Sequence, residues 1–542
     1  MFKSKYWFVF LILIPIILTN CAKRGTITGG PKDTLAPVLT SSFPENYSKK
    51  FEGNTIKLNF DEYVKVKDAN KQVIVSPPLS KPLTILPQGG VGKTLTIRFT
   101  DTLQPNTTYS INFGQSIIDN NEGNPYSAFK YVFTTGESLD SLSIKGATKD
   151  ALSQKDDDYV SVMLYPAETF TDSTIYNQAP LYITNTLEKN TKFTIDFVKE
   201  GKYYLVALKD KANNNKFDPA TDKIGFYNEP IEFPVDSSKV FDLRLFQEDL
   251  PFAIKRPAQQ STNKVSFGVG KTNYEDLSVT TELNNEAIDT RITRVAQKDS
   301  LLLWLPVLDI KKDDSLKITV QNQGEIFTES IRLKTMKQVD SLQINVPRSS
   351  SLGYRDNFKI SPATPIEKFD KSKISIIKKD STQIPFDYKL DKLENMVDLI
   401  FDKEENEVYT ATILPDAIID FYGKTNDTII SKITIAERRE FGDLYITLNN
   451  VKSFPLILQL IDKSEKVIYE TYSEKETYFE FETIKANDYT VRIIYDTDKN
   501  KEWTTGNYLL KRQPEEVLYF QINNGKGVRA NWVVNETIDL SQ

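Results

Sequence analysis

Histidine is absent from the 542-residue sequence, and cysteine occurs once, at Cys21. The lack of histidine excludes Ser-His-Asp and Cys-His catalysis, histidine zinc ligands and histidine proton shuttles. A single cysteine excludes an internal disulfide, a thiolate cluster and a CxxC redox motif. Only Asp, Glu, Lys, Tyr and Ser remain for chemistry, and we expect no enzyme activity.

Clustered positive charge is also missing. The formal net charge is −6, and lysine and arginine form no long block. Phosphate backbones are bound by clustered Lys and Arg, so we expect no nucleic-acid partner. The segment Gly89–Thr94 looks like the end of a nucleotide-binding loop, but Pro87 stands where that motif requires glycine, and the residues that follow alternate as a strand. We therefore interpret it as a hairpin turn and expect no nucleotide.

Aromatic residues are abundant, with 26 Tyr and 31 Phe, which favours strands. Apolar residues alternate with polar ones, as at Ile56, Leu58 and Phe60, and turn clusters separate such runs. No long helical apolar stripe follows residue 21. The length predicts roughly three to five folding units, each with its own core. The fold class is therefore predicted to be all-β, a tandem array of β-sandwiches.

The N-terminal residues have the pattern of a secretory signal peptide. Lys3 and Lys5 precede an apolar run from Tyr6 to Leu18, and Cys21 follows shortly after. This run is short for a membrane span of roughly 20 residues. Leu18 stands three residues before Cys21, as in lipoprotein signals, in which the cysteine thiol accepts diacylglycerol and becomes the new N-terminus. The alternative is an uncleaved N-terminal anchor, and in both cases the rest of the chain lies outside the cytoplasm.

The array repeats internally. Phe193–Asp218 aligns without a gap to Phe479–Thr504 at an offset of 286, and Tyr203 then matches Tyr489. A weaker repeat links Tyr109, Ile117, Ile118, Asp119 and Gly123 with Tyr409, Ile418, Ile419, Asp420 and Gly423. The predicted order is therefore A, B, an unmatched middle segment, A′ and B′.

Several motifs near the N-terminus resemble the SbsA-type bacterial Ig-like domain: Asn54–Val64, Ser76–Leu79, Asp101–Phe113, Ile118–Asn124 and Phe133–Gly136. The tether Thr28–Asp33 resembles the start of Bacteroidota lipoproteins that carry this domain. The B units resemble transthyretin-like sandwiches of carboxypeptidase regulatory regions, in which a turn precedes a Tyr-containing strand, as in Gly201-Lys202-Tyr203. In Bacteroidota an acidic patch after the cysteine accompanies export to the outer face. Its absence here favours an outer-membrane lipoprotein that faces the periplasm.

The resemblance and the repeats together give a domain plan: signal peptide 1–21, flexible tether 22–34, SbsA-type Ig-like domain 35–137, transthyretin-like sandwich 138–248, β-sandwich of unassigned type 249–343, Ig-like sandwich 344–437 and transthyretin-like sandwich 438–542.

Each B unit has an Asp-rich loop after its Tyr-containing strand. Oxygen side chains at alternating loop positions are the arrangement that Ca²⁺ uses in short loops. Ala212 interrupts the first set and Thr504 the second, and polar turn residues that bond their own backbone give the same pattern. We expect turns with at most weak Ca²⁺ binding and no other cofactor. The candidate ligands are Asp210, Asn214, Asp218, Asp496, Asp498 and Asn500.

The tripeptide Asp-(Ser/Thr)-(Leu/Ile/Thr) occurs nine times. It resembles the O-glycosylation acceptor of exported Bacteroidota proteins, in which the hydroxyl after the Asp carries the glycan. At any single position the alternative is a turn opened by Asp-Ser or Asp-Thr before a strand. The candidate acceptors are Thr34, Thr102, Ser141, Ser173, Ser300, Ser315, Ser341, Ser381 and Thr428.

Adjacent carboxylates occur at Asp61-Glu62, Glu404-Glu405 and Glu515-Glu516. Glycosidase chemistry needs two carboxyl groups that flank one bond. Neighbouring residues on a strand point to opposite faces, so we interpret these pairs as solvated surface.

Two functions are consistent with these observations. The first is a non-enzymatic, lipid-anchored envelope protein that acts as a structural spacer or as a scaffold for an unidentified envelope protein. The alternative is a surface adhesin or glycan-binding lipoprotein, in which exposed aromatics such as Trp503 or Trp532 stack on sugar rings.

Overall fold

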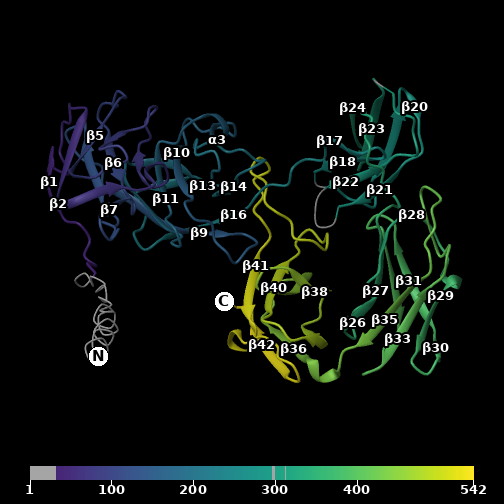
Figure 1. Cartoon of the computed structure of the whole chain (residues 1–542). Helices are drawn as coiled ribbons and strands as arrows, with labels where there is room; N and C mark the ends of the chain where they lie inside the picture. Colours follow the sequence, from purple (N-terminus) through teal and green to yellow (C-terminus); the bar gives the residue numbers. More distant parts are fainter. Residues whose placement is uncertain (1–31, 271, 296–299, 312, 542) are drawn as a thin grey trace, which may run out of the picture. The chain divides into compact units, whose positions relative to one another are not determined.

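The computed structural model describes residues 32–270, 272–295, 300–311 and 313–541. The predicted signal peptide, Cys21 and most of the predicted tether lie outside the described residues. Helical elements in the described part contain at most four residues, and none is long and apolar enough to cross a membrane. The chain forms two compact units, which meet in sequence at Ser141 and Leu142. Strands dominate both units (Figure 1), which confirms the all-β prediction.

The first unit contains one sandwich, called here the first sandwich. Its elements are β1 (Leu39–Phe43), β2 (Thr55–Val66), α2 (Ala69–Gln72), β3 (Ile74–Ser76), β4 (Thr84–Leu86), β5 (Gly92–Arg98), β6 (Thr108–Asn112), β7 (Ile117–Asp119) and β8 (Lys130–Thr134). One sheet has the order β1-β2-β5-β4, with β7 paired to β2, and the other has the order β3-β6-β8. A strand, β5, follows Gly89 and Gly90, so the hairpin interpretation of this segment is confirmed.

Aromatic rings fill the core of the first sandwich. The predicted inward residues Ile56 and Leu58 are fully buried. The Phe133 ring lies 4.3 Å from the Phe51 ring and 5.4 Å from the Tyr109 ring, measured between centroids. Such aromatic pairs contribute about 0.5–1.5 kcal/mol each beyond their buried area.

The second unit contains four sandwiches, each with a separate hydrophobic core. The second sandwich is built from β9 (Leu142–Asp150), β10 (Ser161–Pro166), α3 (Thr174–Asn177), β11 (Tyr182–Asn185), β12 (Lys192–Val198), β13 (Gly201–Lys209), β14 (Lys223–Phe226), β15 (Ile231–Phe233) and β16 (Val240–Leu245). Its sheets have the orders β11-β10-β13-β14, with β15 paired to β13, and β12-β9-β16.

The third sandwich consists of β17 (Ile254–Ser261), β18 (Lys264–Val269), β19 (Ser278–Leu283), β20 (Glu286–Ala287), β21 (Arg291–Arg294), β22 (Ser300–Trp304), β23 (Ser315–Asn322) and β24 (Glu325–Arg332). Two four-stranded sheets, β17-β18-β22-β21 and β20-β19-β23-β24, enclose its core.

The fourth sandwich consists of β25 (Ile344–Asn345), β26 (Ser349–Leu352), β27 (Phe358–Pro362), β28 (Ile366–Phe369), η1 (Lys371–Lys373), β29 (Ile374–Lys378), β30 (Gln383–Ile384), β31 (Phe386–Asp391), β32 (Met396–Phe401), β33 (Val408–Ile413), β34 (Ile418–Asp420) and β35 (Ile429–Ile435). Its larger sheets are β25-β27-β32-β31 and β26-β35-β33-β29-β30, and β28 pairs with β34.

The fifth sandwich consists of η2 (Arg438–Glu440), β36 (Phe441–Asn449), β37 (Leu456–Ile461), β38 (Val467–Ser473), β39 (Tyr478–Lys485), β40 (Thr490–Tyr495), β41 (Val517–Gln521), η3 (Ile522–Gly525) and β42 (Val533–Asp539). Its sheets are β39-β36-β42 and β38-β37-β40-β41.

The second and fifth sandwiches share a topology. In each, a central strand pairs antiparallel with one neighbour and parallel with the other, as in β12-β9-β16 and β39-β36-β42. The Tyr203 hydroxyl donates to the carbonyl of Lys199 at 3.2 Å, and the Tyr489 hydroxyl donates to the carbonyl of Lys485 at 2.8 Å. Both partners lie four residues upstream, which confirms that the two tyrosines are equivalent.

The weaker repeat also has matching local structure. The Tyr109 hydroxyl accepts the backbone N–H of Gln104 at 2.9 Å, and the Tyr409 hydroxyl accepts that of Glu404 at 2.8 Å. In both copies a buried aspartate, Asp119 or Asp420, accepts backbone N–H groups of the turn that follows.

Candidate functional site

The Asp-rich loops follow the equivalent strands β13 and β40. Asp210 and Asp496, which begin the loops, are buried. Asp210 Oδ2 accepts the N–H of Asn215 at 2.6 Å, and Asp496 Oδ2 accepts the N–H of Lys501 at 2.9 Å. In each loop the aspartate therefore bonds a backbone group five residues further on, which closes the turn.

A second buried carboxylate closes each loop from the far side. Asp222 accepts the N–H groups of Lys211 and Asp218, each at 3.0 Å. Glu515 accepts the N–H of Thr497 at 2.5 Å and that of Thr504 at 3.0 Å. These donors correspond at the repeat offset of 286. The two carboxylates do not, so different sequence positions provide the same two hydrogen bonds.

The solvated-surface interpretation is wrong for Glu515, whose side chain is buried. Glu516 is partly exposed, and its carboxylate contacts Lys452 at 2.8 Å. Both residues precede β41, so strand alternation does not apply to this pair. Sequence reasoning missed Asp222 and the role of Glu515, because each becomes a loop partner only through strand pairing after the loop. One signal was available in the sequence. Glu515 is an acidic residue just before β41 and is not part of an alternating strand pattern.

Three acidic side chains converge in the loop of the fifth sandwich. Carboxylate oxygens of Asp496, Asp498 and Glu515 all lie within 4.8 Å of one another. The Thr504 hydroxyl joins them and donates to Asp498 Oδ2 at 2.7 Å. The side-chain oxygen of Asn500 instead accepts the N–H of Glu502 at 2.7 Å, which directs it to the backbone.

The candidate ligands of the second sandwich do not form such a triad. Asn214 Oδ1 accepts the N–H of Lys216 at 2.8 Å, and Asp218 Oδ1 accepts that of Ala220 at 3.0 Å. Among the described residues, the group of three acidic side chains whose carboxylate oxygens lie within 4.8 Å of one another is the triad of the fifth sandwich. Of the two loops, the fifth sandwich's has the better geometry for a cation.

Positive charge lies beside this acidic triad. The Lys501 Nζ lies 5.4 Å from the centroid of the Tyr472 ring. The pKa of Tyr472 is raised, first by burial and then by the Asp496 carboxylate beside it. Backbone and hydroxyl donors also occupy oxygens of all three carboxylates. A cation here competes with these donors and with the lysine, so the arrangement is suited primarily to holding the loop.

The segment that follows this loop contacts the second sandwich. Residues 504–513 are called here the arm. Thr505 Oγ1 donates to the carbonyl of Gln247 at 2.7 Å, and Gln513 Nε2 donates to that of Phe226 at 3.0 Å. Lys511 Nζ forms an ion pair with Asp172 at 2.6 Å. The arm therefore joins the first and last sandwiches of the second unit.

Tyr508 is the buried aromatic residue of the arm, with 2% of its surface exposed. Its ring meets the Phe226 ring edge to face at 5.2 Å, and its N–H donates to Glu248. At Gly506 an added Cβ would lie 2.4 Å from the Phe246 ring. Only glycine fits such a close approach without displacing the ring.

The tryptophans proposed for glycan contact differ in exposure. Trp503 is partly buried, and its indole N–H donates to the carbonyl of Glu515 at 3.3 Å. Trp532 is 43% exposed. Of these two, Trp532 is the more exposed.

The candidate acceptor hydroxyls are distributed over both units. Ser300 and Ser315 begin strands and are partly buried, whereas the other seven residues are exposed. Asp33, Asp101 and Asp380, which precede three of them, accept backbone N–H groups within two residues. Asp33 and Asp380 bond the residue two positions further on, as the turn interpretation requires, whereas Asp101 bonds the next residue and the distant Ser80. An exposed turn also leaves the adjacent hydroxyl accessible.

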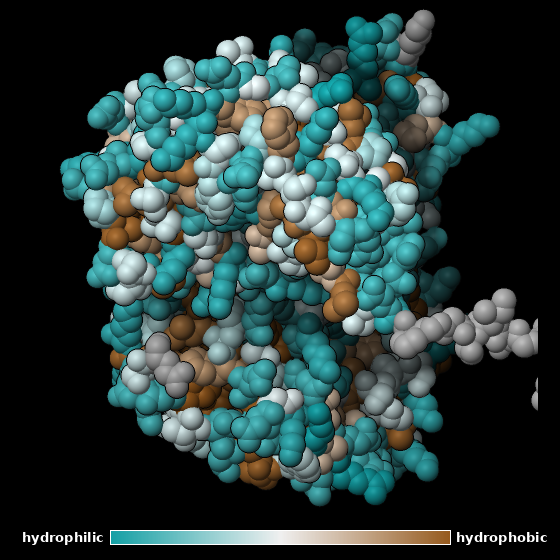
Figure 2. All heavy atoms as spheres, turned by 90° about the vertical axis from the view of Figure 1, so that its left-hand side faces the viewer, coloured by the Kyte–Doolittle hydropathy of each residue, from teal (hydrophilic) through white to brown (hydrophobic). Residues whose placement is uncertain are grey.

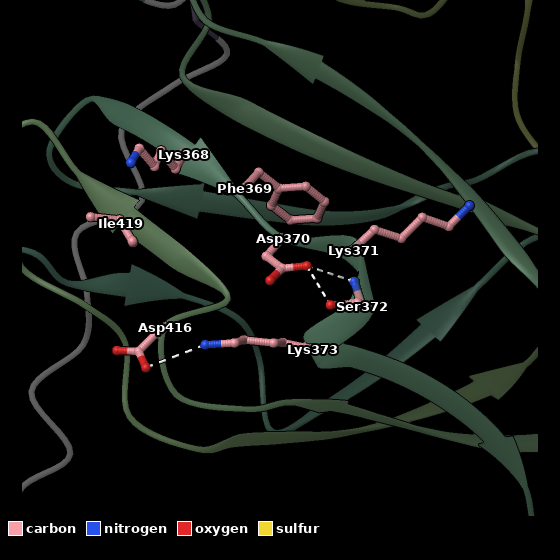
Figure 3. Close-up of a pocket in the computed structure, with 8 residues that line it drawn as sticks. All are labelled: Lys368, Phe369, Asp370, Lys371, Ser372, Lys373, Asp416 and Ile419. Carbon is pink, nitrogen blue, oxygen red and sulfur yellow. Dashed lines mark hydrogen bonds and ion pairs between the residues drawn. The ribbon is translucent and has the colours of Figure 1, made fainter.

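A shallow pocket of about 510 Å³ lies in the fourth sandwich (Figure 3), lined by Lys368, Phe369, Asp370, Lys371, Ser372, Lys373, Asp416 and Ile419. Lys373 pairs with Asp416 at 3.3 Å, and Asp370 accepts the N–H and hydroxyl of Ser372. The Lys368 and Lys371 side chains extend in opposite directions in Figure 3. The cations do not converge on one ligand position.

Comparison with known proteins identifies one part of the chain. Residues 33–135 match the family described as a bacterial Ig-like domain. The first sandwich is therefore similar to bacterial Ig-like domains. No curated protein matches the sequence significantly.

Solved structures similar to the chain include a titin fragment, A168–A169, with 15% identity, covering 34% of this chain and 96% of that one at a TM-score of 0.14. Domains 1–6 of the surface layer protein SbsC share 12% identity over 85% of this chain and 64% of that one, also at 0.14. The tandem Ig repeats of Dlar share 14% identity over 34% of this chain and 99% of that one, at 0.14.

Proposed function

We propose that this chain is a non-catalytic, lipid-anchored protein of the bacterial cell envelope that acts as a rigid spacer or as a scaffold for another envelope protein. The signal-like N-terminus that ends at Cys21 supports the anchor. The bacterial Ig-like domain supports the bacterial source. The lack of histidine and the single cysteine support a role without catalysis.

The observation that carries the proposal is the arm. It connects two sandwiches whose sequences are separated by two others, through an aromatic anchor, hydrogen bonds and an ion pair. In a flexible array of domains, short linkers connect sequence neighbours, and contacts between distant domains are not required. A connection between the ends of the unit instead restricts the motion of everything between them.

Junctions between successive sandwiches of this unit are also bonded. Arg291 of the third sandwich pairs with Glu367 of the fourth at 2.9 Å. Lys485 of the fifth pairs with Asp356 of the fourth at 2.9 Å. The Lys485–Asp356 pair is exposed and adds little, since exposed ion pairs contribute about 0–1 kcal/mol. Arg291 is partly buried and bonds both carboxylate oxygens of Glu367, the stronger bidentate arrangement. Together with the arm they support a unit that moves as one body.

Rigidity can be measured by the distance between two spin labels. We would attach them to cysteines introduced at the exposed residues Glu229 and Glu474, in a chain that starts at residue 22 and so lacks Cys21. A narrow distance distribution supports the spacer. A broad distribution of label-to-label distances, in a protein whose arm carries no substitution, would contradict the rigid spacer.

The location and the partner need experiments on cells. We propose that the protein faces the periplasm and carries O-glycans on some of its exposed acceptor hydroxyls. Protection from protease added to intact cells is the expected result, and cleavage would support the surface adhesin instead. Crosslinking in whole cells followed by mass spectrometry identifies the partner and the glycosylated residues.

A further inference from the structure

The outer face of the sheet β39-β36-β42 in the fifth sandwich has an unusual composition. Leu444, Ile446 and Leu448 of β36 point into the core, so the residues between them point outward. Cross-strand register places Glu480 and Asn535 on either side of Tyr445, and Tyr478 beside Thr447. We call this surface the tyrosine face, consisting of Tyr445, Thr447, Tyr478, Glu480, Glu482 and Asn535.

The two rings of the tyrosine face are ordered side by side. Their centroids lie 6.4 Å apart, and their planes are parallel to within 4°. Tyr478 is 52% exposed. The Tyr445 hydroxyl donates to Glu482 at 2.9 Å, and this bond raises the pKa of Tyr445 to about 12. The hydrogen bond to Glu482 also restricts the orientation of the Tyr445 ring.

A groove continues the face along β42. It has a volume of about 530 Å³ and is lined by Asn523, Trp532, Val533, Val534, Asn535 and Glu536. β42 is the last strand of its sheet within the described residues, so this edge is open. Asn535 belongs both to the groove and to the tyrosine face. The groove therefore adjoins the tyrosine face at Asn535, and Trp532 is an exposed aromatic residue in its lining.

The fold does not require these tyrosines, as the second sandwich shows. Phe193 and Phe479 are equivalent, and the register then places Lys192 at the position of Tyr478 and Lys145 at that of Tyr445. Both lysines are exposed. The same sheet is therefore built with two cations in one copy and with two aromatic rings in the other. The topology of this sheet therefore does not depend on the two rings.

The charge of the tyrosine face indicates what it can bind. β36 and β42 contain no lysine or arginine, and Lys485, at the end of β39, is paired with Asp356. Glu480 and Glu482 are exposed and make the face negative. One cation lies beside the face, because Arg355 Nε donates to the carbonyl of Glu482 at 2.6 Å. A single guanidinium beside two carboxylates is not the cluster of cations that a polyanion requires. Carboxylate and amide groups beside flat rings match a ligand that has many hydroxyl groups and an apolar ring face.

We propose that the tyrosine face and its groove bind a neutral polysaccharide. Pyranose rings stack on Tyr445, Tyr478 and Trp532, and their hydroxyls bond Glu480 and Asn535. This goes beyond a spacer role, because it would fix the scaffold to a glycan of the envelope or of its surroundings.

The experiment uses the protein from residue 22 to 542 in affinity electrophoresis through gels that contain a neutral β-glucan, a neutral α-glucan or a mannan. Alginate serves as the polyanionic comparison and polylysine as the cationic one. The test variant is Tyr445→Lys with Tyr478→Lys, which introduces the side chains of the second sandwich and so keeps the fold. Trp532→Ala tests the groove. Tyr63→Ala, at a residue of the first sandwich that is 57% exposed, is the matched control.

We expect at least one neutral polysaccharide to retard the protein. The double variant should lose about ten-fold or more in affinity, because two stacked rings are removed, and Trp532→Ala should also weaken binding. Tyr63→Ala should bind as before. The proposal is overturned if no neutral polysaccharide binds, if the double variant binds equally well, or if only polylysine binds through this face.

Discussion

Replacing Tyr508 by alanine should release the arm from the second sandwich while leaving each sandwich folded. Tyr508 lies outside the core of its own sandwich, and its ring packs against Phe226 and Tyr176 of the second. Its removal therefore affects the contact between sandwiches rather than the fold of either.

The magnitude follows from burial. Tyr508 is 2% exposed, and truncation of a buried aromatic residue to alanine costs about 3–5 kcal/mol. At about 1.4 kcal/mol per factor of ten, the docked state should weaken by roughly a thousand-fold. The Tyr508 hydroxyl is buried without a hydrogen-bond partner among the described residues. Tyr508→Phe removes an unpaired polar group and should dock as well as the natural chain or better.

Hydrogen exchange of residues 504–513, together with the spin-label distance, measures this effect. We expect Tyr508→Ala to exchange rapidly in the arm and to broaden the distance distribution. Leu510→Ala is the matched control, because Leu510 belongs to the same arm and is 71% exposed. If Tyr508→Ala and the natural chain show the same exchange and the same distances, the arm does not hold the unit together.

Four further predictions concern other groups. Burial raises the pKa of Glu248, so the protonated form is favoured in the docked state, and docking should weaken as pH rises through that raised pKa. Hydrogen exchange of the arm, measured as a function of pH, tests this. Glu248→Gln should abolish the pH dependence. Glu515→Ala leaves the N–H groups of Thr497 and Thr504 without their acceptor and should lower the stability of the fifth sandwich by about 2–3 kcal/mol in thermal unfolding, whereas Glu516→Ala should have almost no effect. Calorimetric titration with Ca²⁺ should show a Kd no tighter than about 10⁻⁴ M, and submicromolar binding would reveal a metal site where we expect a turn. Cys21→Ser should release the protein from the membrane fraction or leave an unprocessed precursor; normal cleavage with unchanged membrane association would contradict lipidation.

The Asp-rich loops show how far the sequence pattern reaches. The gap-free repeat placed Asp210 and Asp496 at the same structural position, because a register shift of one residue would turn each strand's core face to water. It did not reveal that Asp222 and Glu515 complete the two loops. Those residues meet the loops only through strand pairing, and the two copies use different positions for the same hydrogen bonds.

Alternation of apolar and polar residues was sufficient to determine the all-β class and the first sandwich's inward residues, since strand geometry sends neighbouring side chains to opposite faces. The signal-like N-terminus and the absence of histidine are also properties of the sequence alone. Only the tertiary structure decided that Glu515 is buried, that residues 504–513 contact the second sandwich, and that Tyr445 and Tyr478 lie side by side on one face. Each of these depends on contacts between residues far apart in the chain, and local periodicity contains no information about such contacts.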